Sequence, residues 1–290
     1  MKRGLITWDK AELPPSVFEA RLATARQALA DQDLPALLVY TDVWRSTEGR
    51  HLTNFMPYWN RSLIVIPREQ APVLLCGLSP RVYPWIKSVT VFEEIRPASK
   101  LVPTLLQLCS ERGWTKLGVL DLRRLPHEIL LPLKASAVDV HDVKLELTDD
   151  AEIAMHRRAA QMAREILTAE LPNGRGLTDY QFSGRLERAF RGAGAEDLVL
   201  LFSTGESAPA PARGATLGDQ YSVAVAFEYR GHWVRVTRAQ APEAAIRTLR
   251  NRFEEALAEN LSDGIFVLHV EAKQGGRLFY GDTCTAGAPL

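Results

Sequence analysis

The chain has 290 residues, enough for two domains of ordinary size. Hydrophobic residues make up 46% of it and charged residues 24%, a composition that excludes a disordered chain. Lys plus Arg and Asp plus Glu both total 35, so the formal net charge is zero. This balance gives no electrostatic reason to expect nucleic acid or an anionic membrane as a partner.

The N-terminal residues and the cysteines give no indication of secretion, of membrane insertion or of a disulfide framework. Residues 1–9 lack the apolar core of a signal peptide, and no stretch approaches the ~20 apolar residues of a membrane span. Cys76, Cys109 and Cys284 are far apart in apolar surroundings, which is typical of buried free thiols. We therefore expect a cytoplasmic protein.

The first half of the chain alternates helical and strand patterns. Residues 16–33 have apolar side chains at helical spacing, and the apolar run 36–40 follows as a strand. The β-branched runs 63–67 and 72–76 are bounded by turn formers and predict two more strands. The later expected elements are a strand at 89–95, a helix at 100–112 that ends at Gly113, and a strand at 117–121. This alternation predicts an α/β domain with a mainly parallel or mixed sheet over residues 1–146.

The second half begins with two helices. Residues 149–170 form an amphipathic pattern, for which Thr148 is the expected N-cap, and the segment 172–174 stops it. Thr178 is the expected cap of a second helix, which Gly194 closes.

A hairpin follows these helices. Valines and a phenylalanine alternate with small residues over 222–227, a turn is expected at 228–231, and a return strand covers 232–238. A hairpin centred between Tyr229 and Arg230 places three pairs on one face. These expected pairs are Ala224 with Arg235, Ser222 with Thr237, and Ala226 with Trp233.

Gly218-Asp219 before the first strand, and Gly231-His232-Trp233 and Thr237-Arg238 on the second, resemble a known hairpin. It is the "GD-x-V-x-x-D … GY-x-x-D-x-T-R" hairpin of the creatinase, aminopeptidase P and prolidase family. Further matches lie in the same order as in that family: 50–55 with "R-Y-L-T-G-F", 150–160 with "K-x-x-x-E-I-x-x-x-R-x-A", 264–267 with "G-M-V-F", and 281–283 with "E-D-T".

The ordered matches cover nearly the whole chain, which is therefore identified as a divergent member of the family. The resemblance implies an α/β creatinase N-terminal-like domain over 1–146. An α+β pita-bread domain, shortened, is then expected over 147–290.

The family's peptidases hold two divalent metals with two Asp, one His and two Glu, the donors that such ions need. Here the Asp positions fall on Ala224 and Arg235. One helix, 242–260, takes the place of the long segment that carries the family's His. The Glu positions fall on Gly281 and on Val270, or on Glu271 if the alignment slips by one. The resemblance therefore implies no metal, no other cofactor and no metallopeptidase activity.

Arg235 is the candidate that most changes the chemistry of this face. A guanidinium where relatives hold carboxylates predicts an anion site, with Trp233, Thr237 and Ser222 as substrate-binding neighbours. The alternative is that Arg235 pairs with Glu271 or another acid and fills the former metal site structurally.

His232 and His269 are candidate acid/base groups, because imidazole titrates near neutral pH. His232 alternates with Arg235 and should point to the opposite sheet face, whereas His269 shares a face with Glu271. The predicted catalytic residues are therefore His269, Glu271 and Arg235, although either histidine could be purely structural.

Tyr58, Trp59 and Arg61 follow the "R-Y-L-T-G-F"-like segment. In relatives this region reaches toward the substrate pocket, often across a dimer interface, and aromatic residues with Arg suit either role. The three are predicted substrate-binding residues, and the resemblance implies a homodimer.

Two functions remain open. The first is a metal-independent creatinase-like enzyme, a C–N hydrolase or lyase acting on a small polar molecule. Creatinase uses a histidine in the loop before the Gly-Asp strand, and residues 203–213 contain none, so its chemistry does not carry over directly. The second is a non-catalytic pita-bread protein that binds a peptide, a small ligand or a partner protein.

Overall fold

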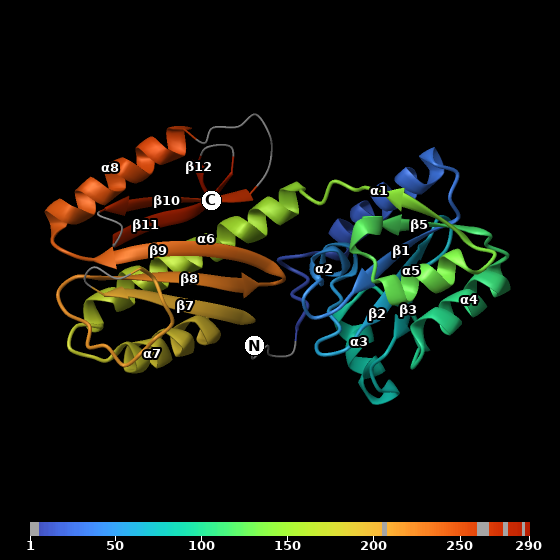
Figure 1. Ribbon diagram of the computed structural model, residues 1–290, viewed down its shortest axis with the longest axis horizontal. Helices are drawn as coiled ribbons and strands as arrows, with labels where there is room; N and C mark the ends of the chain where they lie inside the picture. The colour runs from blue at the N-terminus through green and yellow to red at the C-terminus, as the bar shows by residue number, and fades with distance from the viewer. Residues whose placement is uncertain (1–5, 205–207, 260–266, 275–277, 286–287) are drawn as a thin grey trace. The chain divides into compact units, whose positions relative to one another are not determined.

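The computed structural model describes residues 6–204, 208–259, 267–274, 278–285 and 288–290 (Figure 1). The described chain forms two compact units, which divide between Leu147 and Thr148. Each unit has its own sheet and its own covering helices. Among the described residues, no helix is both long enough and apolar enough to cross a lipid bilayer.

The N-terminal unit, residues 6–147, is a mixed sheet covered by helices on both faces. Its strands are β1 (Ala36–Thr41), β2 (Ser62–Pro67), β3 (Val73–Cys76), β4 (Glu94–Pro97), β5 (Lys116–Leu120) and β6 (Asp139–Val143). They lie in the order β4-β3-β2-β1-β5-β6, in which β2 is antiparallel to both its neighbours and the other pairs are parallel. Its helices are α1 (Pro15–Asp31), α2 (Thr47–Thr53), α3 (Tyr83–Val89), α4 (Leu101–Arg112) and α5 (His127–Lys134).

Two hydrophobic clusters fill the space on either side of this sheet. One joins α1, α2 and α3 to one face, and the other joins α4 and α5 to the opposite face. The central strands are therefore buried on both faces, which explains their nearly continuous apolar sequences. This three-layer arrangement confirms the predicted α/β architecture.

Local boundaries follow the sequence signals with one correction. Gly113 caps α4 in the left-handed conformation, as expected. The predicted strand at 89–95 is wrong in its first half, because Val89 is the last residue of α3 and β4 starts at Glu94. Pro84 in the first turn of α3 favours a helix, and Ile86 and Val89 supply its buried face.

The C-terminal unit is an antiparallel sheet with three helices. Its strands are β7 (Asp197–Thr204), β8 (Tyr221–Tyr229), β9 (His232–Gln240), β10 (Val267–Gln274), β11 (Leu278–Thr285) and β12 (Ala288–Pro289), and its helices are α6 (Asp150–Glu170), α7 (Asp179–Gly192) and α8 (Glu243–Glu259). The strand order is β10-β11-β9-β8-β7, and the short β12 pairs with β11. Residues 264–266 of the "G-M-V-F"-like segment lie outside the described residues.

The helix caps partly match the predictions. Thr178 forms a full capping box with Gln181, as expected. The cap of α6 is Asp149 rather than Thr148, because the Asp149 side chain accepts a hydrogen bond from the N–H of Glu152. An aspartate also complements the positive end of the helix dipole.

All three helices pack on the same face of the C-terminal sheet, which we call the helix-covered face. Phe190 of α7 contacts Phe227, Phe253 of α8 clusters with Val270 and Cys284, and α6 lies against β8 and β9. Figure 1 shows α6 running behind these strands. The other face we call the helix-free face, because no helix of the described residues packs on it.

The β8/β9 hairpin has a different register from the one predicted. Tyr229 pairs with His232, so the loop is the two-residue turn Arg230-Gly231. Ala224 therefore lies opposite Thr237, and Arg235 lies opposite Ala226. The error is two residues along one strand, so every side chain stays on its predicted face. Both loop residues have positive φ (51° and 88°), the conformation that two-residue hairpin loops favour.

Candidate functional site

The three predicted catalytic residues meet on the helix-free face. The Nη2 atom of Arg235 lies 2.9 Å from Oε1 of Glu271, and Nε2 of His269 lies 3.1 Å from the same oxygen. The His269 hydrogen bond, followed by the charge of Arg235, lowers the pKa of Glu271 below its ordinary value, although burial opposes this. Glu271 is therefore a carboxylate at neutral pH, held by an imidazole and a guanidinium.

Gly281 makes room for this cluster. It lies directly opposite Glu271 on β10 and opposite Thr237 on β9. A Cβ atom at Gly281 would lie 2.9 Å from the carbonyl oxygen of Val270 and 3.2 Å from both Cγ of Glu271 and Cε1 of His269. Position 281 therefore accepts no side chain here without a shift of the backbone.

Val270 and Glu271, the two candidates for the other expected glutamate position, are neighbours on β10 and lie on opposite faces of the sheet. Val270 is buried on the helix-covered face beside Phe253. Glu271 points to the helix-free face, where it reaches Arg235. Of these two residues, Glu271 is therefore the one that places an acid beside Arg235.

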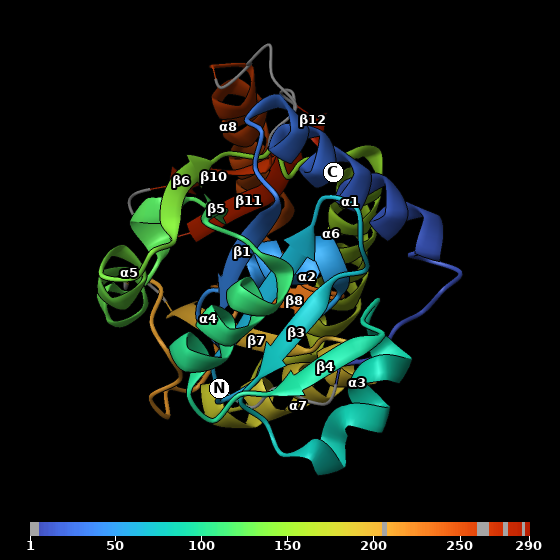
Figure 2. The ribbon, with the colours of Figure 1, turned by 90° about the vertical axis from the view of Figure 1, so that its right-hand side faces the viewer.

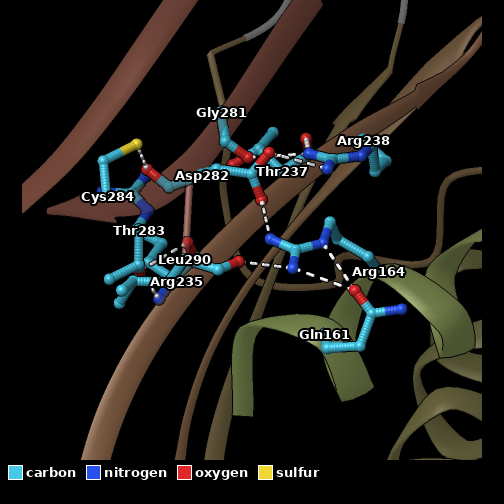
Figure 3. Close-up of polar contacts among 10 residues, drawn as sticks. All are labelled: Gln161, Arg164, Arg235, Thr237, Arg238, Gly281, Asp282, Thr283, Cys284 and Leu290. Atoms are coloured by element: carbon cyan, nitrogen blue, oxygen red, sulfur yellow. Dashed lines mark hydrogen bonds and ion pairs between the residues drawn. The ribbon is translucent and has the colours of Figure 1, made fainter. Parts of the chain in front are cut away.

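Thr283 holds the backbone of β9 at this site, a role that sequence reasoning missed. Its hydroxyl accepts a hydrogen bond from the N–H of Arg235 at 2.7 Å and donates one to the Arg235 carbonyl at 2.9 Å. Figure 3 shows Thr283 beside Arg235. The available signal was its place in the "E-D-T"-like segment, which brings it next to the hairpin.

The predicted substrate-binding residues of the hairpin share this face but differ in exposure. Ser222 and Thr237 are fully buried, and the hydroxyl of Thr237 has no hydrogen-bond partner in the described structure. Trp233 lies opposite Glu228 and is 38% exposed. In place of the expected polar pocket, Ser222 and Thr237 are buried side chains on the same face as Arg235, and Trp233 is partly exposed near the hairpin turn.

His232 lies on the helix-covered face, the side expected from its alternation with Arg235. Its Nε2 atom lies 2.9 Å from Oε2 of Glu152 in α6, and Nε2 of His156 lies 3.4 Å from the other oxygen of that carboxylate. The two imidazole rings contact each other edge to face. This cluster joins α6 to β9 and places His232 away from Arg235.

A second buried charge network lies on the same covered face. Asp282 of β11 accepts from Nη2 of Arg238 at 2.7 Å and lies 3.4 Å from Nη1 of Arg164 in α6. Arg238 also stacks over Tyr280, and Arg164 bonds to Gln161 and to the carbonyl of Leu290 (Figure 3). The network ties α6, β9 and β11 together beneath the Arg235 cluster.

Tyr58, Trp59 and Arg61 belong to the N-terminal unit. Tyr58 is buried, and its hydroxyl accepts a hydrogen bond from the N–H of Ile6 at 2.6 Å. Trp59 is 85% exposed, and Arg61 forms an ion pair with Glu128. Tyr58 therefore packs inside its own unit, while the roles predicted for Trp59 and Arg61 stay predictions.

A metal centre needs several donors at one point, and the described residues offer none of the required groupings. No cluster of three or more His, Cys, Asp or Glu in these parts of the chain could hold a metal ion. Ala224, Arg235 and Gly281, where the resemblance leads us to expect ligands, carry no donor side chain for a cation.

The fold matches solved structures of Xaa-Pro peptidases, at low identity. The prolidase from Pyrococcus horikoshii OT3 is similar with a TM-score of 0.69 and 13% identity, over 93% of this chain and 96% of that one. The dipeptidase PepE from Mycobacterium ulcerans has a TM-score of 0.67 and 15% identity, over 98% and 96%. These likenesses show the prolidase-type fold.

A third match is not named as a peptidase. The N-terminal domain of the FACT complex subunit SPT16 from Cicer arietinum has a TM-score of 0.59 and 14% identity, over 86% of this chain and 73% of that one. No protein-family model and no curated protein sequence matches the chain.

Proposed function

We propose that this chain is a metal-independent, non-catalytic protein of the Xaa-Pro peptidase fold that binds a peptide or small ligand. The observation that carries the proposal is the Arg235–Glu271 ion pair on the helix-free face. A guanidinium at this point repels a divalent cation and already neutralises the carboxylate nearest to it. The donors left around it do not fit a pair of divalent ions.

The state of Glu271 also argues against turnover. A general base must keep a lone pair free for the substrate proton, and its pKa should lie near the working pH. Glu271 instead accepts from two cationic or donor groups, and its pKa is lowered by them. Oε1 of Glu271 is therefore engaged by Arg235 and His269, and the lowered pKa makes this carboxylate a weak general base.

The match to the SPT16 domain supports a binding role by analogy. That protein is described as a subunit of a complex, and its N-terminal domain resembles this chain in fold, as the peptidases do. Because both kinds of protein share this fold, the fold does not distinguish catalysis from binding, and the residues of the site must do so. Here Arg235 and Glu271 have the features of a structural ion pair.

The first test measures metal and hydrolysis together. We expect elemental analysis of the purified protein to find far less than one divalent ion per chain, even after incubation with Mn²⁺ and Zn²⁺. EDTA should leave the unfolding midpoint unchanged, and prolyl dipeptides should remain intact. Two tightly held ions per chain, or dipeptide hydrolysis that EDTA abolishes, would refute the proposal.

The binding part is tested with Ala-Pro as the probe. NMR titration should show saturable shifts on β9 and β10 without product formation, and Arg235→Ala should weaken them. Arg230→Ala, in the hairpin turn, is the matched control and should bind like the wild type. Shifts that do not saturate, or that Arg235→Ala leaves unchanged, would refute the proposal that this site binds prolyl dipeptides.

A second candidate function rests on His269. Its Nδ1 atom is buried without a hydrogen-bond partner while Nε2 contacts Glu271, the geometry of an oriented imidazole base. A metal-independent C–N hydrolase would use this nitrogen to take a proton after a movement of the ring exposes it, because the atom is buried in this structure. Turnover of small amides that His269→Gln abolishes, with the unfolding midpoint unchanged, would favour this function over the first.

A further inference from the structure

A cavity of about 550 Å³ opens in the N-terminal unit, at the end of the sheet where β3 and β4 finish and β2 begins. Figure 2 shows β3 and β4 side by side in this unit. Ligands of open α/β sheets bind beyond the carboxyl ends of parallel strands, and this volume lies within the range of small-molecule sites. The lining residues that the argument uses are Asn60, Arg61, Gly77, Lys100, Leu101, Glu128 and Ile129.

Hydrogen bonds within the protein fix the part of the cavity wall formed by Asn60, Arg61 and Gly77. The side-chain amide of Asn60 donates to the carbonyl of Gly77 at 2.6 Å, and its oxygen accepts from the N–H of Arg61 at 2.7 Å. A Cβ atom at Gly77 would lie 2.8 Å from both the Arg61 carbonyl and the Asn60 side-chain oxygen. Only glycine allows this close approach, which holds Arg61 at the cavity edge.

The charges at the cavity favour an anion. Arg61 and Lys100 are cationic, and Glu128 is the one acid among the lining residues of this cavity. Lys100 is exposed and forms no ion pair with any other described residue. The pair between Arg61 and Glu128 is half exposed on both sides, so it is weak and a ligand can replace it.

Apolar side chains supply the rest of the surface. Leu101 and Ile129 line the cavity and belong to the hydrophobic cluster beneath α4 and α5. We propose that this cavity binds a small organic anion, with its oxyanion head on Arg61 and Lys100 and its apolar body on Leu101 and Ile129. The site uses residues of the N-terminal unit alone, so it does not depend on the function proposed for Arg235.

The test uses hexanoate and butyl phosphate as probes of the two head groups, with hexanamide as the neutral counterpart. Titration of the isotope-labelled full chain should give saturable NMR shifts at Gly77 and Lys100 for at least one anion. Hexanamide should bind at least tenfold more weakly. Arg61→Gln and Lys100→Gln should each weaken the anion about tenfold, and Glu128→Gln should tighten it because it removes the competitor for Arg61.

Arg68→Gln is the matched control. Arg68 follows β2 directly at its other end, and it also pairs with acidic residues, Asp33 and Glu69. This variant should bind like the wild type. Failure of both anions to saturate would overturn the proposal, as would equal binding of hexanamide or equal weakening by Arg68→Gln.

Discussion

The two faces of strand β9 differ in what their charged residues do. On the helix-covered face, Arg238 meets the buried Asp282, and His232 meets Glu152 of α6. On the helix-free face, Arg235 and His269 share the carboxylate of Glu271.

This contrast teaches that alternate side chains of the same strands do different work. Arg238 and Asp282 join β9, β11 and α6 on the helix-covered face, whereas Arg235 and Glu271 join β9 and β10 on the other. The first prediction removes a charge from the network on the helix-covered face. The next two alter residues of the helix-free face, and each should change the free energy of unfolding less than the one before.

The largest effect is expected from Asp282→Asn. Asp282 is 3% exposed in its side chain and is the shared acceptor of Arg238 and Arg164. Removing its charge leaves two guanidinium groups in buried surroundings, a change that typically costs about 3–5 kcal/mol. Urea unfolding of the variant should show this loss of free energy.

Asp219→Asn provides the comparison for that experiment. Asp219 pairs with Arg175, and both side chains are about 70% exposed. Exposed pairs contribute roughly 0–1 kcal/mol, so this variant should unfold close to the wild type. Equal losses in the two variants would contradict the structural role given to the covered network.

A medium effect is expected from Gly281→Ala. The new Cβ would be forced against the Val270 carbonyl and the side chains of Glu271 and His269, and overpacking of this kind costs about 1–3 kcal/mol. Gly184→Ala, on an exposed part of α7 with open space at its Cβ position, should instead gain about 0.5–1 kcal/mol. A neutral result at Gly281 would show that the helix-free face still has room for a longer side chain.

Sequence patterns predicted most elements, because each depends on residues close together in the chain. The Thr178 capping box and the Gly113 cap illustrate this, since the residues that form each lie within a few positions. The hairpin register was missed by two residues because Arg230 takes a positive φ beside Gly231. Periodicity fixes the face of a side chain, but the turn fixes its partner.

The site was only partly predictable for a different reason. The Arg235–Glu271 pair was one of two open interpretations, and its presence depends on a sheet that brings residues 36 positions apart together. The hydrogen bonds of Thr283 to the Arg235 backbone and the Glu152–His232 contact also join distant segments. No local pattern encodes such pairs, so only the folded sheet reveals them.

The smallest effect concerns Glu271→Gln and its dependence on pH. The pKa of Glu271 is lowered in the folded protein, chiefly by His269 and then by Arg235, from an ordinary value of 4.5. A lowered folded pKa adds stability that is present above the unfolded pKa and is lost as the pH falls through the folded pKa. The variant should therefore lose about 1 kcal/mol at pH 7, discounted because Arg235 is 38% exposed, and progressively less below pH 4.5.

Urea unfolding of wild type and variant across pH 3–7 measures this difference, with Glu187→Gln as the control. Glu187 forms a surface pair with Arg191 one helical turn away, so its removal should change stability by only about 0.3–0.5 kcal/mol. A gap between wild type and Glu271→Gln that stays constant below pH 4.5 would mean that the carboxylate is not stabilised by its partners. The ion pair would then not be what holds the helix-free face together.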